Sequence, residues 1–158
     1  MDVKIKCEEG EFKFRVAGLL IVNEKVLTVD ICDNGFYCLP GGHVHLGESS
    51  ADAMLREFKE EVGIECRVGN AVALIENFFK NKKGKMMHEV CYYYLIEPLE
   101  EIETKDYCCV ENDDGELKQL HFRWIDLKDA DKEDFRPTIL AKKLSRGDMA
   151  FEHIIFKD

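Results

Sequence analysis

Residues 42–64 read GHVHLGESSADAMLREFKEEVGI, and they are the most informative segment for predicting the fold. It predicts a helix from Ser49 to Val62, because Ser49 and Asp52 have the spacing of an N-terminal capping box, with Asp in place of the usual Glu or Gln. Gly63 stands where a residue in the left-handed conformation ends many helices. Four apolar residues recur at i, i+4, i+7 and i+11 and form a stripe that we expect to face a sheet: Ala51, Leu55, Phe58 and Val62.

Three acids share one face of this helix. Glu57, Glu60 and Glu61 lie at i, i+3 and i+4, a spacing at which like charges destabilise a helix by roughly a few tenths of a kcal/mol per pair. Arg56 can bridge to Glu60, but one arginine does not neutralise three acids. A hard divalent cation would, since Mg²⁺ takes its ligands from carboxylate oxygens. Taken alone, the triplet also fits a solvated charged face.

A glycine pair precedes the helix. Gly41 and Gly42 follow Pro40 and let the backbone come close to whatever the carboxylates hold. Glu48 stands just before the start of the helix. For the glycines alone, a tight turn is an equally good interpretation.

The whole stretch fits the pattern G-x5-E-x7-R-E-U-x-E-E-x-G-U, in which U is a bulky apolar residue. The matching residues are Gly42, Glu48, Arg56, Glu57, Phe58, Glu60, Glu61, Gly63 and Ile64. With nine specified positions across 23 residues, the segment resembles the signature box of the Nudix hydrolases. The sequence Leu39-Pro40-Gly41-Gly42 and the pair Trp124-Ile125 extend the resemblance along the chain.

The resemblance implies an α/β fold, the Nudix α/β/α sandwich with a mixed β-sheet between helices. It also implies hydrolysis of a nucleoside diphosphate linked to another group. Glu57, Glu60 and Glu61 would bind Mg²⁺ or Mn²⁺, joined by a backbone carbonyl of Gly41 or Gly42. By the same resemblance, Arg56 would orient the glutamates and Glu48 would support the junction of loop and helix. A Nudix-fold sensor that binds a nucleotide or ADP-ribose without cleaving it is the alternative.

Members of the family often add a carboxylate from a late loop, as a metal ligand or a general base. Four acids of this chain lie in the corresponding region: Glu111, Asp113, Asp114 and Glu116. No spacing selects among them, and we favour Glu116. Each also fits a solvated loop acid.

Aromatic residues outside the box are candidates for stacking on a nucleobase. Tyr37 replaces the Trp that many members carry two residues before Leu-Pro-Gly-Gly, and Phe79 is a second candidate. Phe78 and Tyr92 are further aromatic options, and ordinary sheet core is the alternative for all four. The basic segment Lys80–Lys85 either attracts phosphates or is a solvated hairpin loop.

The remaining chain predicts strands and a second helix. Strands are expected at residues 12–22, 25–31, 71–79, 90–96, 117–125 and 151–156, and an acidic loop at residues 97–116. Pro137 can occupy the first turn of a final helix that ends at Gly147, with Ile139, Leu140 and Leu144 inward.

Composition bounds the possible functions. The chain has 158 residues, 32 of them acidic and 22 basic, for a net charge of −10. This length predicts one domain over residues 1–158, and the negative charge argues against binding to long nucleic acids.

No apolar stretch is long enough for a membrane span, and no signal peptide is recognisable. Seven cysteines without a C-x-x-C pair fit a reducing cytoplasm. The expected partner is a small nucleotide-type substrate, and a homodimer stays open.

Overall fold

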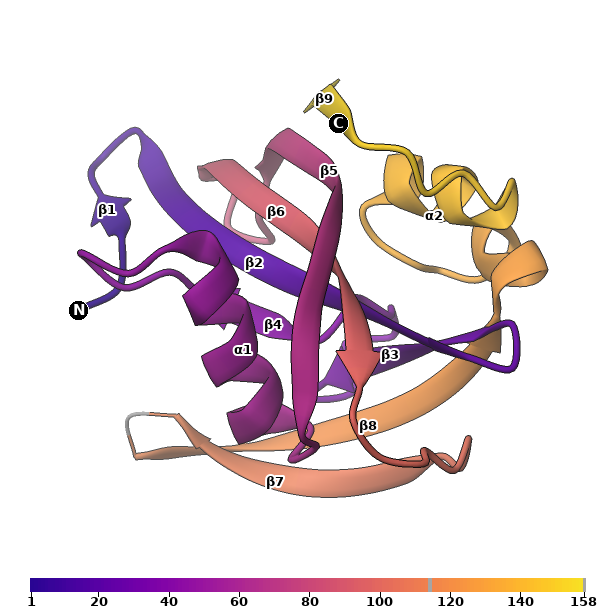
Figure 1. Ribbon diagram of the computed structural model, residues 1–158. Helices are drawn as coiled ribbons and strands as arrows, with labels where there is room; N and C mark the ends of the chain where they lie inside the picture. Colours follow the sequence, from indigo (N-terminus) through magenta and orange to yellow (C-terminus); the bar gives the residue numbers. More distant parts are fainter. Residues whose placement is uncertain (114, 158) are drawn as a thin grey trace.

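The computed structural model describes residues 1–113 and 115–157, without the side chain of Asp113, and consists of a mixed sheet with helices on both faces (Figure 1). The main path of the sheet runs β7-β8-β3-β2-β6-β5-β9, and β1 and β4 also pair with β2. The strands are β1 (Lys4–Lys6), β2 (Gly10–Val22), β3 (Lys25–Ile31), β4 (Gly41–His43), β5 (Cys66–Lys80), β6 (Met86–Pro98), β7 (Tyr107–Asp113), β8 (Glu116–Asp126) and β9 (Glu152–Lys157). The helices are α1 (Ser50–Glu61), the 3-10 segment η1 (Leu127–Lys132) and α2 (Thr138–Ser145).

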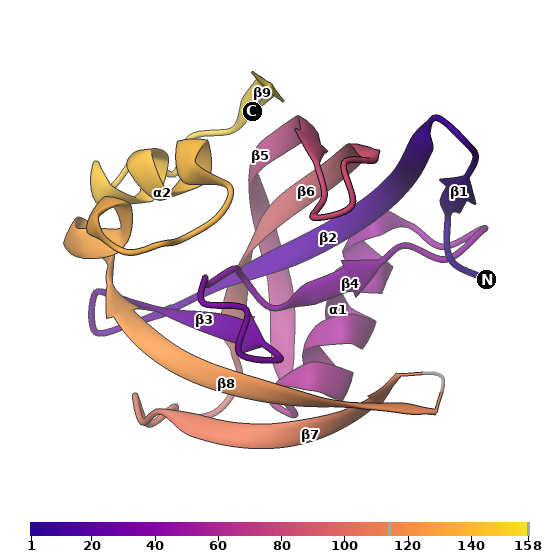
Figure 2. The same ribbon diagram turned by 180° about the vertical axis from the view of Figure 1, so that it is seen from behind.

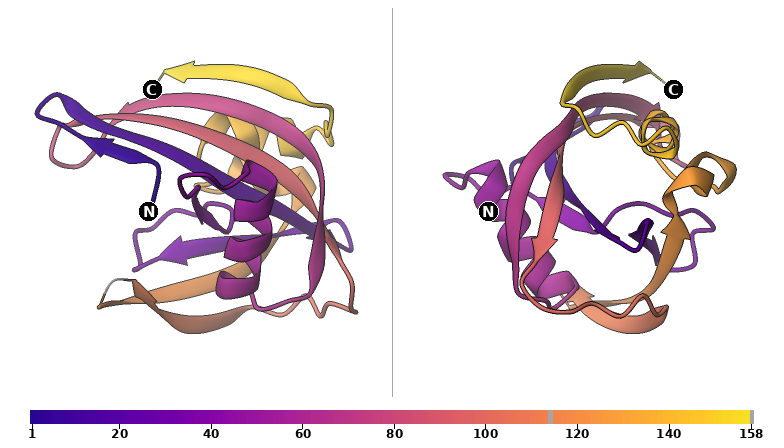
Figure 3. Two further views of the ribbon diagram at one scale, coloured as in Figure 1. Left: turned by 60° about the vertical axis from the view of Figure 1, so that its left-hand side comes forward. Right: turned by 45° about the vertical axis from the view of Figure 1, so that its right-hand side comes forward.

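The predicted α/β/α sandwich is confirmed. β2 pairs with β6, and β5 with β9, in parallel, whereas the other named pairs are antiparallel. Figures 2 and 3 show α1 and α2 on opposite sides of the central strands. Side chains alternate along β2: Val16 and Leu20 belong to the core under α1, and Ala17 and Leu19 to the core under α2. A strand buried on both faces has this continuous apolar character.

Helix α1 forms where its sequence predicts it. The Ser49 side chain accepts a hydrogen bond from the Asp52 backbone N–H at 3.1 Å, which satisfies one of the free donors of the first turn. At the other end, Gly63 has a φ of 78°, the left-handed conformation that ends a helix.

The predicted apolar stripe of α1 is right for Phe58, which is buried, and for Val62, which packs against the core, but it is wrong for the other two residues. Ala51 is exposed and Leu55 is 43% exposed. The residues buried against the sheet are Ala53, Met54 and Phe58, roughly a quarter turn away. The inward face also carries Glu57 and Glu61, and these polar residues interrupt its apolar pattern. Hydrophobic periodicity therefore favours a different face of the helix.

A glycine lets α1 lie close to β2. A Cβ atom at Gly18 would lie 2.7 Å from Cε2 of Phe58 and 2.8 Å from Cγ1 of Ile96. Both distances are shorter than carbon contacts in a packed core. Gly18 therefore sets the separation of the helix and the sheet.

Strands β2 and β3 leave room for the glycine loop between them. They pair only near their shared turn, where Ile21 faces Val26 and Val22 faces Lys25. Farther along β2, residues Arg15 to Ala17 pair with β4 instead. The short strand β4 contains the glycine pair, so this divergence brings it beside the helix.

The expected acidic loop at residues 97–116 contains a strand, which corrects the prediction. Residues Tyr107 to Asp113 form β7 and pair with β8 in an antiparallel hairpin. Tyr, Cys and Val favour strands, but the acids on both sides concealed this segment.

The C-terminal prediction is confirmed in outline. Pro137 is the N-cap of α2, Leu140 and Leu144 are buried, and Gly147 follows the helix with a φ of 67°. Ile139 is only partly buried. Among the described residues, no helix combines the length and the hydropathy that a membrane span requires.

We predict that Gly18→Val lowers the free energy of unfolding by about 1–3 kcal/mol, the usual cost of overpacking a core. Urea denaturation followed by circular dichroism measures the change. Adding Phe58→Leu should restore part of the loss, since the two side chains compete for one space. A Gly18→Val variant with an unchanged unfolding midpoint would refute the packing role of this glycine.

Candidate active site

Asp2 and four glutamates line one cavity of about 360 Å³. Glu57, Glu60 and Glu61 come from α1, and Glu111 comes from β7. The glycine pair of β4 also lines the cavity, as do the cationic residues Arg15, Arg56 and Lys118. The structure thus gathers all three predicted box acids and the glycine pair around one space.

Arg56 is held by four hydrogen bonds. It donates from Nε and Nη2 to the Glu48 carboxylate at 2.8 and 2.9 Å, from Nη1 to Oε1 of Glu57 at 2.6 Å, and from Nη2 to the His43 carbonyl at 3.0 Å. Glu48 also accepts from the His45 backbone N–H at 2.9 Å. The bonds from Arg56 lower the pKa of Glu48 to about 2. This network ties the loop after β4 to α1 and fixes one oxygen of Glu57.

Glu60 is the outermost acid of the three. Its carboxylate lies 3.6 Å from Nη1 of Arg56, and its side chain is 62% exposed. Because the pair faces water, it adds little stability. Glu60 is the box acid that can move most freely.

Both glycines are required by close approach. The Gly41 N–H donates to Oε2 of Glu61 at 3.0 Å. A Cβ at Gly41 would overlap the Val16 carbonyl oxygen, and one at Gly42 would overlap the Glu57 carboxylate. Neither glycine has a positive φ, so the interpretation as a simple tight turn does not apply here.

Burial and like charge disfavour ionisation of the inner acids. The pKa of Glu61 rises to about 8 because the group is buried and lies near the carboxylates of Glu111 and Glu57. Burial also raises the pKa of Glu57, against the opposing effect of Arg56. The cavity therefore favours either protons or a bound cation.

The late carboxylate in this cavity is Glu111, whereas Glu116 does not line it. Glu116 is exposed and lies opposite Asp113 at the far end of the β7–β8 hairpin. Asp114 and the side chain of Asp113 fall outside the described residues. Glu111 shares the inward face of β7 with Tyr107 and Cys109, an alternation that becomes visible once residues 107–113 are known to be a strand.

The donor set fits a hard cation. Within residues 1–113 and 115–157, no three His, Cys, Asp or Glu side chains already stand close enough to hold a metal. One oxygen of Glu57 is taken by Arg56 and one of Glu61 by Gly41, so each carboxylate keeps a second oxygen. Oxygen ligands without thiolates are the set that Mg²⁺ and Mn²⁺ prefer.

His43 and His45 also line the acidic cavity, and both lie near Asp2. Nδ1 of His43 lies 3.6 Å from the Asp2 carboxylate, and Nε2 of His45 lies 3.3 Å from it. Burial and the charge of Arg15 lower the pKa of His43 to about 4, which favours its neutral form.

The two predicted stacking residues do not line the acidic cavity. Tyr37 packs against the core under α2, with the Arg123 guanidinium 5.4 Å from its ring centre. Phe79 lies on β5 opposite Met87 of β6, and the basic segment that follows it forms the exposed turn between these strands.

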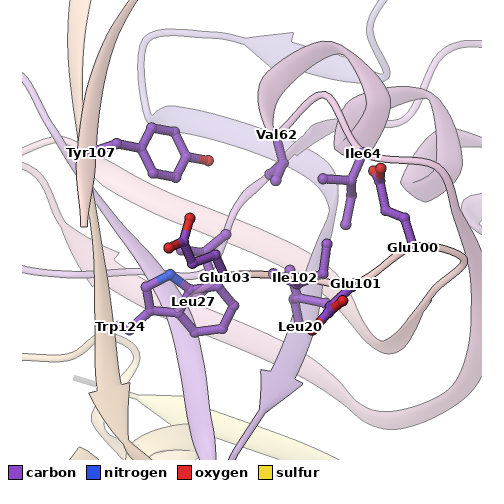
Figure 4. Close-up of a pocket in the computed structure, with 10 residues that line it drawn as sticks. All are labelled: Leu20, Leu27, Val62, Ile64, Glu100, Glu101, Ile102, Glu103, Tyr107 and Trp124. Atoms are coloured by element: carbon purple, nitrogen blue, oxygen red, sulfur yellow. The ribbon is translucent and has the colours of Figure 1, made fainter. Parts of the chain in front are cut away.

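A second cavity, of about 280 Å³, lies beyond the C-terminal end of α1. Figure 4 shows Tyr107 and Trp124 on one side of it, with Val62 and Ile64 toward the helix. Glu100, Glu101 and Glu103 also line it. None of the predicted site residues lines this cavity.

The chain is similar to known proteins in sequence. Residues 12–143 match the NUDIX domain family. The chain is 28% identical over 127 residues to the probable DHNTP pyrophosphohydrolase of Lactococcus lactis subsp. cremoris, an alignment covering 78% of this chain and 69% of the relative. It is 34% identical over 95 residues to the asymmetrical bis(5'-nucleosyl)-tetraphosphatase of Mus musculus, covering 58% of this chain and 56% of the relative.

A solved structure extends the likeness to the fold. The mutator MutT protein of Bacillus halodurans superimposes with a TM-score of 0.57 at 15% sequence identity, over 89% of each chain. The chain spans 34% to 56% of the length of three of the curated relatives that it matches, the Mus musculus tetraphosphatase among them. Because the family match covers most of the chain and contains the helix, the glycine pair and the carboxylates of the cavity, the chain belongs to the Nudix hydrolase family.

Proposed function

We propose that this chain hydrolyses a pyrophosphate bond in a nucleoside diphosphate linked to another group, with Mg²⁺ or Mn²⁺ as cofactor. The main support for this function is that one cavity is lined by Glu57, Glu60, Glu61, Glu111 and the glycine pair. A surface helix has no structural reason to turn two carboxylates inward. A cation shared by these acids and a polyphosphate gives that reason.

The residues that would hold the metal are Glu57, Glu60, Glu61 and the backbone carbonyl of Gly42, with Glu111 as the late acid. The metal would supply charge neutralisation for the pyrophosphate and would acidify or position the attacking water. Glu48 holds Arg56, and Arg56 in turn fixes the Glu57 carboxylate. Arg56 therefore holds the Glu57 carboxylate in one orientation, and its second oxygen would be available to the metal.

The names of the relatives define the substrates to test. They include a probable DHNTP pyrophosphohydrolase, an asymmetrical bis(5'-nucleosyl)-tetraphosphatase and an ADP-ribose pyrophosphatase. All three names describe small molecules that contain a phosphoanhydride. The experiment is a panel of nucleoside triphosphates, DHNTP, ADP-ribose, nucleotide sugars and dinucleoside polyphosphates, with Mg²⁺ or Mn²⁺ and chromatographic product analysis.

Cleavage at a phosphoanhydride of any substrate supports the proposal. Tight binding without cleavage across the panel would instead support the non-catalytic sensor. Neither binding nor cleavage in the presence of either metal would contradict both functions.

We predict that Glu60→Gln and Glu61→Gln each lower kcat at least about 100-fold, because removing charge stabilisation at the reacting phosphates has this magnitude. Steady-state kinetics with the best substrate of the panel measures the loss. Far-UV circular dichroism controls for folding. Native turnover in both variants would refute the proposed role of these acids.

In the metal-free protein, we predict that Glu61→Gln raises the free energy of unfolding by about 1 kcal/mol. At neutral pH, Glu61 must either take up a proton or stay charged beside Glu57 and Glu111, and both cost free energy. The amide of Gln avoids this cost, and its oxygen still accepts from the Gly41 N–H. Thermal unfolding in EDTA measures this gain. With Mg²⁺ or Mn²⁺, the native protein should gain more in Tm than the variant, and an equal gain would contradict metal binding by Glu61.

A matched pair tests the late carboxylate. We expect Glu111→Gln to lower kcat about 10-fold or more, because Glu111 lines the cavity, and we expect Glu116→Gln to leave kcat unchanged. Both variants lie in the β7–β8 hairpin and remove one charge, so they share any general electrostatic effect. The reverse pattern would restore Glu116 as the late acid.

A further inference from the structure

Two arginines line the acidic cavity, and they differ in how they are bonded. Arg56 uses Nε, Nη1 and Nη2 in hydrogen bonds to Glu48, Glu57 and the His43 carbonyl. Arg15, on β2, has only one close carboxylate among the described residues, with Nη1 3.5 Å from Glu89. Its Nε is buried and has no hydrogen-bond partner in the described part of the chain.

An arginine that serves only to stabilise a fold normally satisfies its donors. A guanidinium carries five N–H donors in a planar fork that matches carboxylates and phosphates at two points. Burying one of these donors without a partner is unfavourable, since the lost hydration is not replaced. The contact with Glu89 involves a single nitrogen of Arg15. Most N–H donors of the guanidinium therefore do not take part in it.

Arg15 lies where a bound polyphosphate would meet it. It projects from β2, whereas the carboxylates come from α1 and β7, and all of them line the same cavity. The positive charge of Arg15 acts on Glu61, where it opposes the rise in pKa, and on His43. Its side chain is 27% exposed and lines the cavity, and Nη1 lies near Glu89.

Resting on the proposed function, we propose that Arg15 binds a phosphate oxygen of the substrate, from the wall of the cavity that β2 supplies. The acids of α1 repel a polyphosphate and need a cation between them and it, whereas Arg15 attracts the phosphate directly. Glu89 positions the guanidinium without saturating it. Two kinds of contact then hold the pyrophosphate: one through the metal that the acids bind, and one through the fork of Arg15.

The test compares Arg15→Lys with Arg67→Lys. Lysine at position 15 keeps the charge that pairs with Glu89 but loses the fork, so the buried carboxylate is not left alone. Arg67 is exposed on β5 opposite Glu97 and controls for an Arg-to-Lys change elsewhere. The probe is methylenediphosphonate, a non-hydrolysable pyrophosphate analogue without a nucleoside, titrated by calorimetry in the presence of Mg²⁺.

We expect Arg15→Lys to raise the Kd for methylenediphosphonate about tenfold or more, since one charge-assisted bidentate contact has at least this effect. Arg67→Lys should match the native Kd. The rise in Tm with Mg²⁺ alone should be the same in all three proteins, because the proposal gives Arg15 no contact with the metal and lysine keeps its positive charge.

The outcomes separate the two proposals. A native Kd in Arg15→Lys overturns the role of Arg15 and leaves the proposed function intact. Loss of both the Mg²⁺ response and diphosphonate binding in Arg15→Lys shows a structural role instead, and also overturns the inference. If the native protein itself binds no methylenediphosphonate with Mg²⁺, the inference fails, whereas the proposed function is decided separately by cleavage in the substrate panel.

Discussion

The arrangement of the whole site depends on the contact between the glycine pair of β4 and the carboxylates of α1. The Gly41 N–H donates to Glu61, and the Glu57 carboxylate occupies the space that a side chain at Gly42 would fill. This contact requires β2 and β3 to diverge, so that β4 can pair with β2. It also requires α1 to lie close to β2, which Gly18 permits. Fold and site therefore share the same few glycines.

The buried acids of the site lower the local stability of α1. Glu57 and Glu61 occupy part of the face that α1 turns to the sheet, and burial raises the pKa of both. Arg56 compensates only in part, because Glu48 uses two of its donors. Such unfavourable placement of charge is common at functional sites. The stable part of the helix is provided by Ala53, Met54 and Phe58, which are fully buried beside these acids.

Sequence reasoning identified the box residues and the helix but not the surroundings of the site. Ser49, Gly63 and the three glutamates act within a few residues of one another, so their spacing alone predicts their arrangement. The buried face of α1 was misjudged because functional acids replace apolar residues on it. The sequence alone predicts a loop at residues 107–113 and favours Glu116 over Glu111, because the face of a strand cannot be assigned before the strand is recognised. Tyr37 and Phe79 looked suitable by chemistry, but they lie outside the acidic cavity.

Local sequence patterns are enough to predict the family resemblance, the helix with its two ends, and the three box acids and the glycine pair that meet at the cavity. These features depend on local spacing, and each is set within 23 consecutive residues. The tertiary structure alone decided which late acid joins them and that Arg15 faces the same space. Glu111 and Arg15 lie far from the box along the chain, and their place follows from strand pairing and strand divergence. Contacts of that kind join distant segments, so no short pattern in the sequence records them.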